Sequence, residues 1–334
     1  MWTIWAEKVE GKGEDARPIC DRYGSEAGLL AVFDGMGGAG SRRYALDGAT
    51  FTGAWFASRA VKSALRVMFA QGMAEEKEAE EIFQAAEGAF GPILETLGHG
   101  LEAVPTGLKS KLFRPFPTTM AALYFSQTKT QTNASNIDIR TASAGDSRLY
   151  ALHPIHGLQQ LSRDHLQQDV NPFSALSQDL PLSNCIDATG QGRLQLHRHI
   201  LPAGSLLLAA TDGCFHYVQF PAQFEFFLLN TLHLATSPEN WRTNLQQLLA
   251  GLSGDDISLA LIDPTQRDFP TLQSAFSARR THLQQHYIQP LGQATITDRQ
   301  TLLKSLWQEY APQYSAHIPP PFPLSPTENS IPQP

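Results

Sequence analysis

Residues 29–35 read Leu-Leu-Ala-Val-Phe-Asp-Gly, and a second apolar run, residues 205–211, leads into Asp212-Gly213 in the same way. A short apolar run predicts a buried strand, and the glycine after each aspartate lets the backbone turn where that strand ends. We therefore expect Asp34 and Asp212 at the mouths of two buried strands. Because grouped carboxylates usually serve hard cations, two such ends far apart in sequence indicate a metal site assembled by the fold.

The rest of the chain carries further strand and helix patterns. Short apolar or alternating runs predict strands at 3–9, 28–33, 119–126, 137–143, 148–153, 194–200, 205–211 and 257–262. Longer patterns predict helices at 44–72, 75–98, 222–235 and 238–252, the second with an acidic solvated face. Strands in runs, interrupted by pairs of long helices, predict an α+β fold in which sheet packs on sheet with helices outside.

The composition and charge indicate which kinds of binding partner are unfavourable for this protein. Hydrophobic residues make up 42% and charged residues 17% of the 334 residues, as in globular proteins. The net charge of -7 argues against nucleic acid and against anionic membranes, since both select basic surfaces. The sequence has no bilayer-spanning stretch and no export signal. The cysteines, Cys20, Cys185 and Cys214, are typical of reduced thiols, so we expect a cytoplasmic location.

Residues 35–40, Gly-Met-Gly-Gly-Ala-Gly, match the G-x-G-x-x-G pattern of dinucleotide-binding sites. Asp34, directly before the first glycine, would repel a pyrophosphate. No second strand ending in an acid follows about 20 residues later, where a ribose partner is expected. These two features argue against a dinucleotide site.

Acidic residues recur beside the expected strand ends. They are Glu14, Asp15, Asp34, Asp146, Asp212, Asp255 and Asp256. An aspartate near a turn usually only accepts hydrogen bonds from its neighbours, and for any single member this interpretation stays open. For the whole set, a shared metal site is the better explanation.

Seven short motifs follow one another along the chain. They are Glu14-Asp15-Ala16, residues 33–38, Thr118-Thr119, residues 144–148, Asp164-His165, Thr211-Asp212-Gly213 and residues 254–258. In order and spacing they resemble the motifs of the PP2C-type, metal-dependent protein phosphatases (the PPM family), over roughly residues 3–263. The resemblance implies a four-layer αββα sandwich, with two antiparallel sheets flanked by helix pairs.

The resemblance also implies a centre of two Mn²⁺ or Mg²⁺ ions per active site. Carried over residue by residue, Asp34 would bridge both ions. Asp212 and Asp255 would bind the first ion, and Glu14 and the carbonyl of Gly35 the second. The family also has a third, weaker ion position.

The remaining acids take roles from the same resemblance. Asp15 resembles the acid that orients the attacking water, so the expected catalytic residues are Asp15, Asp34 and Asp212. Asp146 resembles the acid near the third ion. The chemistry agrees, because a phosphate dianion repels hydroxide, and two divalent ions about 4 Å apart neutralise charge and acidify water. The Cys-x₅-Arg stretch of thiol phosphatases is absent from the sequence.

Three positions depart from the family pattern. Glu10 stands where an arginine commonly grips the substrate phosphate, so either Lys8, Lys12 or a remote arginine replaces it, or turnover is weak. Met36 stands where some members have a histidine that protonates the leaving group. Asp256 replaces a frequent asparagine, and its extra charge either tightens metal binding or faces solvent.

The expected function is that of a metal-dependent serine/threonine phosphoprotein phosphatase, acting on a phosphorylated protein and opposing a serine/threonine kinase. The alternative, motivated by Glu10, is a regulatory or phosphoprotein-binding module of the same shape with little catalysis. A binding module would take up metal and phosphopeptide without turning the phosphopeptide over.

The chain divides into an expected phosphatase domain at 1–263, with a polar, flap-like insertion near 164–192, and a C-terminal extension at 264–334. A helix is expected near 298–310. Residues 318–334 are proline-rich and are not expected to pack regularly. This tail is either a docking segment for a partner or simply disordered.

Overall fold

Two five-stranded sheets form the centre of the computed structural model, which describes residues 1–105, 113–129, 135–176, 178 and 180–322. The first sheet has the order β1 (Trp2–Ala6), β13 (Ile257–Ile262), β12 (Leu206–Ala210), β9 (Arg148–His153) and β10 (Gly157–Gln160). The second has the order β11 (Gln195–Pro202), β8 (Ser135–Ala144), β7 (Met120–Lys129), β3 (Ala27–Phe33) and β2 (Ala16–Tyr23). Every pairing within them is antiparallel.

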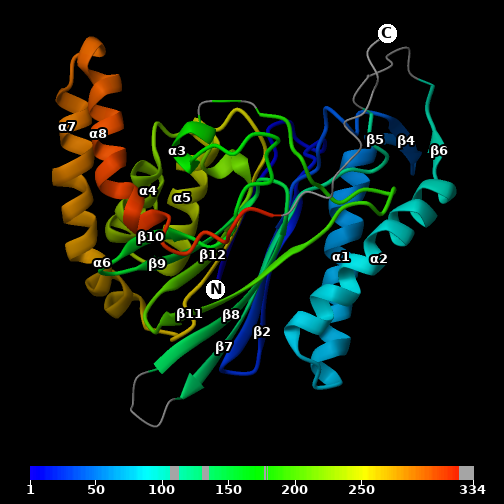
Figure 1. Cartoon of the computed structure of the whole chain (residues 1–334), viewed down its shortest axis with the longest axis horizontal. Helices are drawn as coiled ribbons and strands as arrows, with labels where there is room; N and C mark the ends of the chain where they lie inside the picture. Colours follow the sequence, from blue (N-terminus) through cyan, green and yellow to red (C-terminus); the bar gives the residue numbers. More distant parts are fainter. Residues whose placement is uncertain (106–112, 130–134, 177, 179, 323–334) are drawn as a thin grey trace.

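Helices cover the outer faces of both sheets (Figure 1). α1 (Gly53–Ala74) and α2 (Ala79–Gly100) lie on the second sheet. α4 (Pro221–Leu234) and α5 (Pro238–Leu252) lie on the first sheet. α6 (Phe269–Leu283) and a π-helical turn η2 (Gln284–Ile288) pack on α4, and α7 (Gln289–Gln293) contacts η2 and α8 (Ile296–Tyr314), which contacts β10. The α+β sandwich of two antiparallel sheets flanked by helices is thus confirmed.

The opening stretch is apolar throughout because β3 is buried on both faces. Leu30 and Val32 pack between the sheets, in a cluster that includes Leu207 and Ala209 of β12. Leu29, Ala31 and Phe33 point the other way, into the core under α1 and α2. A strand covered on both sides reads as a continuous apolar run instead of an alternating one.

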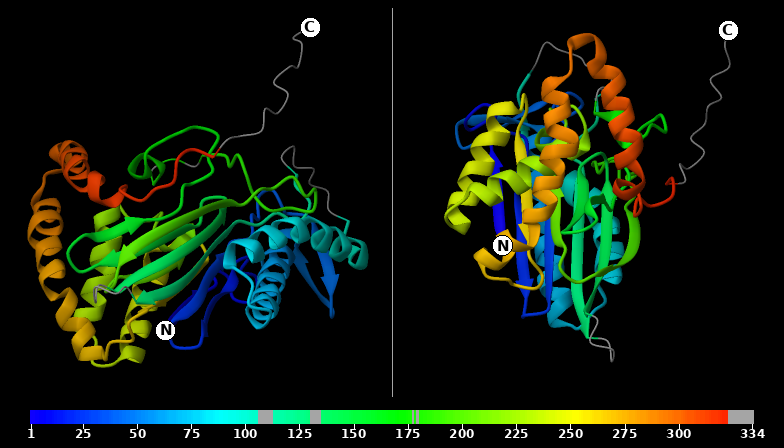
Figure 2. Two further views of the ribbon diagram at one scale, coloured as in Figure 1. Left: turned by 60° about the horizontal axis from the view of Figure 1, so that its bottom comes forward. Right: turned by 90° about the vertical axis from the view of Figure 1, so that its left-hand side faces the viewer.

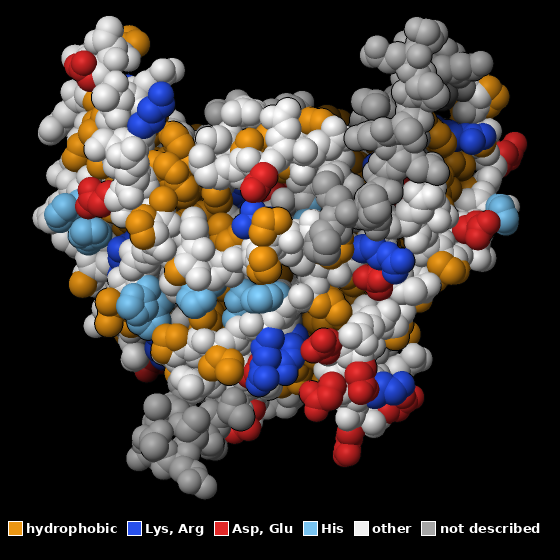
Figure 3. Space-filling model, in the orientation of Figure 1, with side chains coloured by type: hydrophobic (Ala, Val, Ile, Leu, Met, Phe, Trp, Pro, Cys, Tyr) orange, Lys and Arg blue, Asp and Glu red, His pale blue; other side chains and the backbone are white. Residues whose placement is uncertain are grey.

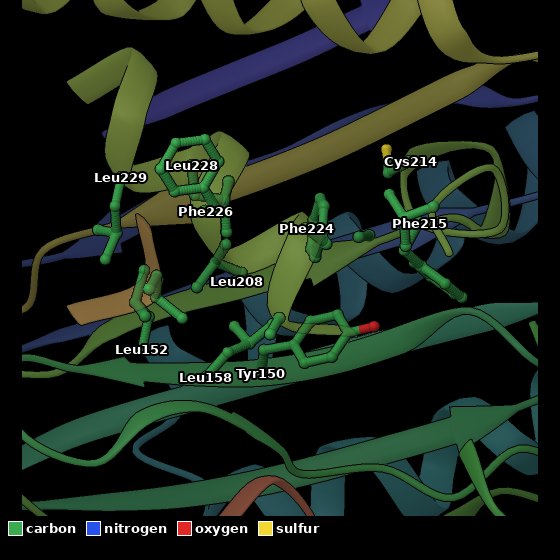
Figure 4. Close-up of a cluster of buried hydrophobic side chains, with 14 of the residues drawn as sticks. Tyr150, Leu152, Leu158, Leu208, Cys214, Phe215, Phe224, Phe226, Leu228 and Leu229 are labelled. Carbon is green, nitrogen blue, oxygen red and sulfur yellow. The ribbon is translucent and has the colours of Figure 1, made fainter. Parts of the chain in front are cut away.

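The second opening strand, β12, is buried in the same two-sided way. Its alternate residues, Leu206, Leu208 and Ala210, join the cluster under α4, and Figure 4 shows Leu208 beside Phe224 and Tyr150. Burial of these strands holds Asp34 and Asp212 where the strands end.

The prediction of a helix over residues 44–72 is wrong for residues 44–52. β4 (Arg43–Leu46) and β5 (Ala49–Thr52) form a hairpin that pairs with β6 (Glu102–Ala103). The turn residues Asp47 and Gly48 have φ of 49° and 80°, the left-handed conformations that an Asp-Gly hairpin turn requires. α1 begins only at Gly53, where the Thr52 hydroxyl accepts a hydrogen bond from the backbone N–H of Trp55 at 3.1 Å.

The acidic solvated face expected on the second helix is present. Its exposed glutamates gather around the start of α2, where Figure 3 shows acidic side chains at the lower right. They are Glu75, Glu76, Glu78, Glu80 and Glu81. None of the described helices combines the length and the apolar character that a bilayer crossing requires.

The insertion at 164–192, called the flap below, connects β10 to β11. In its described residues the regular elements are a four-residue helix, α3 (Pro172–Ala175), and isolated bridges that include Leu166 with Leu182. Another bridge pairs Ile186 with Thr118, next to the start of β7. The flap therefore has little regular structure, and backbone bridges fasten it to the sheet.

The C-terminal extension packs more extensively than its sequence predicts. The expected helix near 298–310 lies within α8, but α6, η2 and α7 were not expected. Leu272, Phe276 and Tyr310 join the same buried cluster as Phe224. Figure 2 shows these helices beside α4 and α5.

Residues 318–322 also differ from the expected unpacked tail. Pro319 is buried, and its carbonyl accepts a hydrogen bond from Arg163 Nε at 2.8 Å. The remainder of the proline-rich segment, 323–334, lies outside the described residues.

Candidate active site

Asp34 follows β3 directly, and its backbone is held by the neighbouring strand. The Asp34 carbonyl accepts hydrogen bonds from Thr119 N at 2.8 Å and from Thr118 Oγ1 at 2.7 Å. Gly35 lies so close to its surroundings that a Cβ there would be 2.7 Å from the carbonyl oxygens of Glu14 and Ala54. Only glycine fits this close contact. Gly35 therefore fixes the position of the backbone from which the Asp34 side chain extends.

Glu14 and Asp15 lie between β1 and β2, and each carboxylate has a hydroxyl partner. Thr52 Oγ1 donates to Glu14 Oε1 at 2.5 Å. Thr211 Oγ1 donates to Asp15 Oδ2 at 2.8 Å, and Asp15 is only 2% exposed. Thr52 lies at the start of α1, on the side of the second sheet, and Thr211 follows β12 of the first sheet. The two hydrogen bonds therefore connect this loop to both sides of the sandwich.

The other acids come from the ends of three different strands. Asp212 opens the turn η1 (Asp212–Cys214) after β12, and Asp255 lies just before β13. Asp146 lies in the tight connection between β8 and β9. His216 Nδ1 is 3.8 Å from Asp212 Oδ2, and both residues line a small cavity with Asp146.

These acids influence one another through their charges. The pKa of Asp34 is raised well above its ordinary value, mainly by burial and then by the charges of Asp15, Asp212, Asp146 and Asp255. Carboxylates that repel one another in this way favour the protonated form, unless a cation neutralises them. The fold has therefore brought the charges of Asp15, Asp146, Asp212 and Asp255 within electrostatic range of Asp34.

Glu14 belongs to the same electrostatic group. Burial raises the pKa of the Glu14 carboxyl, and the charges of Asp256 and Asp255 add to the increase. The Thr52 hydrogen bond and the positive charge of Arg43 act in the opposite direction. Arg59 also acts on these acids, and its Nη1 donates to the backbone carbonyl of Glu14 at 3.3 Å. Arg43 and Arg59 are thus two cations at this edge of the site.

The donor chemistry fits hard divalent ions. All the side-chain donors are carboxylate oxygens, the type that Mg²⁺ and Mn²⁺ prefer. Gly37 keeps the space beside Glu14 open, since a Cβ at Gly37 would lie 1.7 Å from Glu14 Oε2. Within the described part of the chain, no three acids, histidines or cysteines are grouped closely enough to hold an ion directly. Ions that keep several water ligands do not require such a closed cage.

A family model for protein phosphatase 2C matches residues 14–250, which contain Glu14, Asp34, Asp146 and Asp212. The chain belongs to the protein phosphatase 2C family. Asp255 and the helices α6, α7 and α8 lie beyond the matched residues. A comparison with curated protein sequences finds no match.

Solved structures of bacterial phosphatases share the PP2C fold of this chain. The serine/threonine phosphatase Stp1 from Staphylococcus aureus is 18% identical, with a TM-score of 0.53 over 78% of this chain and 94% of that chain. The serine/threonine phosphatase of S. agalactiae is 17% identical, with a TM-score of 0.52 over 78% and 97%. Since the matches cover nearly all of those chains, about a fifth of this PP2C protein has no counterpart in them.

Asp256 has a role that the sequence did not reveal. It is 9% exposed, so it does not face solvent as one interpretation held. Its Oδ1 accepts the backbone N–H of Lys8 at 2.7 Å, and its Oδ2 accepts those of Glu14 at 2.6 Å and Asp15 at 3.4 Å. In this PP2C chain, Asp256 fixes the backbone of the loop that carries Glu14 and Asp15.

Arg148 and His165, both in motifs of the PP2C resemblance, lie at the base of the flap. Arg148 is buried and binds Asp164 through two contacts, Nε to Oδ1 at 2.9 Å and Nη2 to Oδ2 at 2.6 Å. Its guanidinium also lies 4.4 Å from the ring centroid of Phe215, in the turn after Asp212. His165 is buried, and its Nδ1 accepts the backbone N–H of Gly145 at 3.2 Å, next to Asp146.

Glu10 is exposed in the loop between β1 and β2, as are Lys8 and Lys12. Lys8 Nζ is engaged, because it donates to the carbonyl of Ser253 at 2.9 Å. Arg43 lies on the β4–β5 hairpin, an element that the sequence interpretation missed. The Asp-Gly turn at residues 47–48 was the signal that could have located it.

Proposed function

We infer that this chain is a metal-dependent phosphatase of serine/threonine phosphoproteins. The observation that carries this function is the match to the protein phosphatase 2C family over residues 14–250. The charges of Asp15, Asp146, Asp212 and Asp255, which act on Asp34, support it. A site rich in carboxylates cannot bind a phosphate dianion unless cations neutralise it. Metal dependence is therefore part of the same function.

We propose Mn²⁺ or Mg²⁺ as the cofactor, with two ions in each site and a third, weaker position. When bound, the ions neutralise the phosphoryl charge and lower the pKa of the attacking water. Asp34 would hold both ions, Asp212 and Asp255 one of them, and Glu14 and the Gly35 carbonyl the other. A structure of the related phosphatase PstP contains two manganese ions.

Two further acids take positioning roles in this proposal. Asp15 orients the attacking water, and the Thr211 hydroxyl holds its carboxylate by a hydrogen bond of 2.8 Å. Asp146 serves the third position, facing the cavity that it shares with Asp212 and His216. Asp15, Asp34 and Asp212 are thus the proposed catalytic residues.

Arg43 is our proposal for the cation that grips the substrate phosphate in place of the arginine missing at Glu10. It is exposed, and it pairs across the hairpin with Thr52, whose hydroxyl donates to Glu14 Oε1 at 2.5 Å. Its charge partly opposes the rise in the pKa of Glu14. Changing Arg43 to Ala should raise KM for a phosphopeptide with a smaller effect on kcat. Arg42→Ala is the matched control, because Arg42 is directed to the ring of Tyr44 at 5.7 Å. Equal effects of the two changes would exclude Arg43.

The main test uses p-nitrophenyl phosphate and a phosphothreonine peptide with Mn²⁺. Asp34→Asn and Asp212→Asn should each lower kcat by at least about 100-fold, the size of effect seen when one transition-state contact is removed. Asp21→Asn is a control, because Asp21 pairs with Arg66 at the surface. Wild-type protein that hydrolyses neither substrate would contradict the function. Calorimetric binding of Mn²⁺ and phosphopeptide without turnover would then support the alternative, a binding module.

Three further predictions remain open. The first is a serine/threonine kinase that opposes the enzyme, and the second is a cytoplasmic location. The third is docking of a partner through the proline-rich tail. Deleting residues 323–334 and measuring partner capture alongside activity tests the third, and unchanged capture would contradict it.

A further inference from the structure

A second, larger cavity lies beside the acid cluster. The small cavity of about 50 Å³ at Asp146 and Asp212 shares two lining residues, Asp164 and Leu166, with a cavity of about 510 Å³. That volume is in the range of ligand sites, roughly 300–1,000 Å³. Asp164 and Leu166 therefore lie between the small cavity at Asp146 and Asp212 and this larger cavity.

The flap and the C-terminal extension build the larger cavity together. Arg163 and the flap residues 164–172 line one side, and Ser315, Ile318, Pro321 and Phe322 line the other. Figure 1 shows the segment after α8 running across the molecule toward the flap. The extension lies beyond the residues that match the PP2C family model, so this wall is a feature of the present chain.

Three contacts fasten the extension to the flap side of the molecule. Arg163 Nε donates to the Pro319 carbonyl at 2.8 Å. Gln195 Nε2, on β11 next to the flap, donates to the Pro320 carbonyl, also at 2.8 Å. The ring of Phe322 lies 5.1 Å from that of His165. The cavity wall is therefore held by specific contacts.

The lining does not suit a second phosphate. Its charged residues are paired, since Arg163 Nη1 lies 3.0 Å from Asp169 Oδ1 and Asp164 binds Arg148. The uncharged lining contains apolar side chains, such as Val170 and Ile318, and amides, such as Gln167. Such a lining contacts apolar side chains and backbone amides, which are what a polypeptide offers.

We propose that this cavity binds the polypeptide of the phosphoprotein substrate next to its phosphorylated residue. The proposal rests on the proposed phosphatase function. The phosphorylated side chain reaches the acid cluster, and the neighbouring residues lie across Asp164 and Leu166 in the larger cavity. The extension thereby contributes to substrate selection without touching the phosphate.

The test fills the cavity from each wall separately. Val170→Trp fills it from the flap and Ser315→Trp from the extension, and both residues line it. Ile155→Trp is the matched control, since Ile155 is 74% exposed in the turn between β9 and β10. Each protein is assayed with Mn²⁺ on a phosphothreonine peptide, on phosphothreonine with blocked ends, and on p-nitrophenyl phosphate.

The filling variants should raise KM for the peptide about tenfold, with kcat unchanged, which corresponds to about 1.4 kcal/mol of lost binding. Their kcat and KM for the two small substrates should stay within about twofold of wild type, and Ile155→Trp should change nothing. Unchanged peptide KM in both filling variants would overturn the proposal, and so would equal losses on all three substrates. Because each wall has its own variant, one that fails to fold leaves the other as the test. Activity of the wild type on the small substrates checks the phosphatase function independently.

Discussion

Arg148 Nη1 lies 3.5 Å from the phenol oxygen of Tyr314, although 166 residues separate them in sequence. Both side chains are buried, and Arg148 simultaneously binds Asp164 at the base of the flap. Tyr314 is the last residue of α8, so the C-terminal extension contacts the ion pair that anchors the flap beside the acid cluster. The extension is in this way part of the active-site surroundings.

The first prediction concerns this contact. Tyr314→Phe removes the hydroxyl and should lower kcat/KM for a phosphopeptide a few-fold, with a loss of about 1 kcal/mol of stability. Tyr310→Phe is the matched control, because the Tyr310 hydroxyl donates to Glu225 at 2.6 Å within the same extension. The control should lose stability in thermal unfolding and keep wild-type kcat/KM. A Tyr314→Phe enzyme with unchanged kcat/KM would contradict the link to the site.

The second prediction uses two glycines of one loop. Gly37→Ala places a Cβ 1.7 Å from Glu14 Oε2, so the Glu14 carboxylate must move away. We expect Mn²⁺ affinity, measured by calorimetry, to fall roughly 10- to 100-fold, as it does when a ligand is misplaced. Gly38→Ala is the control, since a Cβ there meets nothing within 4 Å. Similar Mn²⁺ affinities in the two variants would remove Glu14 from the ligand set.

The third prediction concerns Asp256, whose two oxygens accept three backbone N–H groups. Asp256→Asn turns one acceptor into a donor that faces an N–H, which should cost about 1–3 kcal/mol of stability. The loop of Glu14 and Asp15 should loosen, so half-saturation by Mn²⁺ should require a higher concentration. Asp263→Asn is the control at the other end of β13, where Asp263 accepts the N–H groups of Thr265 and Arg267. It should lose stability without changing the Mn²⁺ dependence.

The fourth prediction is a pH dependence of stability away from the site. Burial, with the charges of His197 and His317, lowers the pKa of His199 to about 3. The neutral ring is favoured in the folded protein, so its contribution is complete above the unfolded pKa near 6.5. It is lost as pH falls toward 3, at up to about 1.4 kcal/mol per pH unit.

His199→Gln removes this titration. The free energy of unfolding, measured by urea titration, should then fall less steeply between pH 6.5 and 3 than in the wild type. A change of the exposed His233 to Gln should leave the slope unaltered. A wild-type slope in the His199 variant would show that its ring is protonated equally in both states.

Much of the fold was predictable because its signals are local. The continuous apolar runs before Asp34 and Asp212 correctly predicted buried strands, and the structure buries both strands on both faces. The hairpin of β4 and β5 was missed because an Ala- and aromatic-rich pattern outweighed the Asp-Gly turn at its tip. The helices α6 and α7 were missed because their hydrophobic residues show little helical periodicity. Packing of their side chains in the same buried cluster as α4 stabilises them.

The acids themselves could be named from sequence, since each follows or precedes a strand pattern. The spatial arrangement of these acids could not be derived from the strand patterns. A turn signal shows where one strand ends, but it does not show which other strands end next to it in the fold. The anchoring of Glu14 and Asp15 by Asp256 depends on β1 lying against β13, from the two ends of the PP2C fold. The contact of Tyr314 with Arg148 likewise needs α8 on the first sheet.

The amino-acid sequence by itself determined the strand ends and glycine turns at Asp34 and Asp212, and it named the carboxylates that we propose as metal ligands. Only the tertiary structure decided which backbone groups Asp256 holds, and that Arg43 pairs with Thr52, the residue whose hydroxyl binds Glu14. It also decided that the extension lines a cavity next to the one at Asp146 and Asp212. The physical reason is the distance along the chain over which each kind of interaction acts. Periodicity and turn chemistry act over a few neighbouring residues, whereas these contacts join segments far apart in the chain that only sheet pairing and core packing bring together.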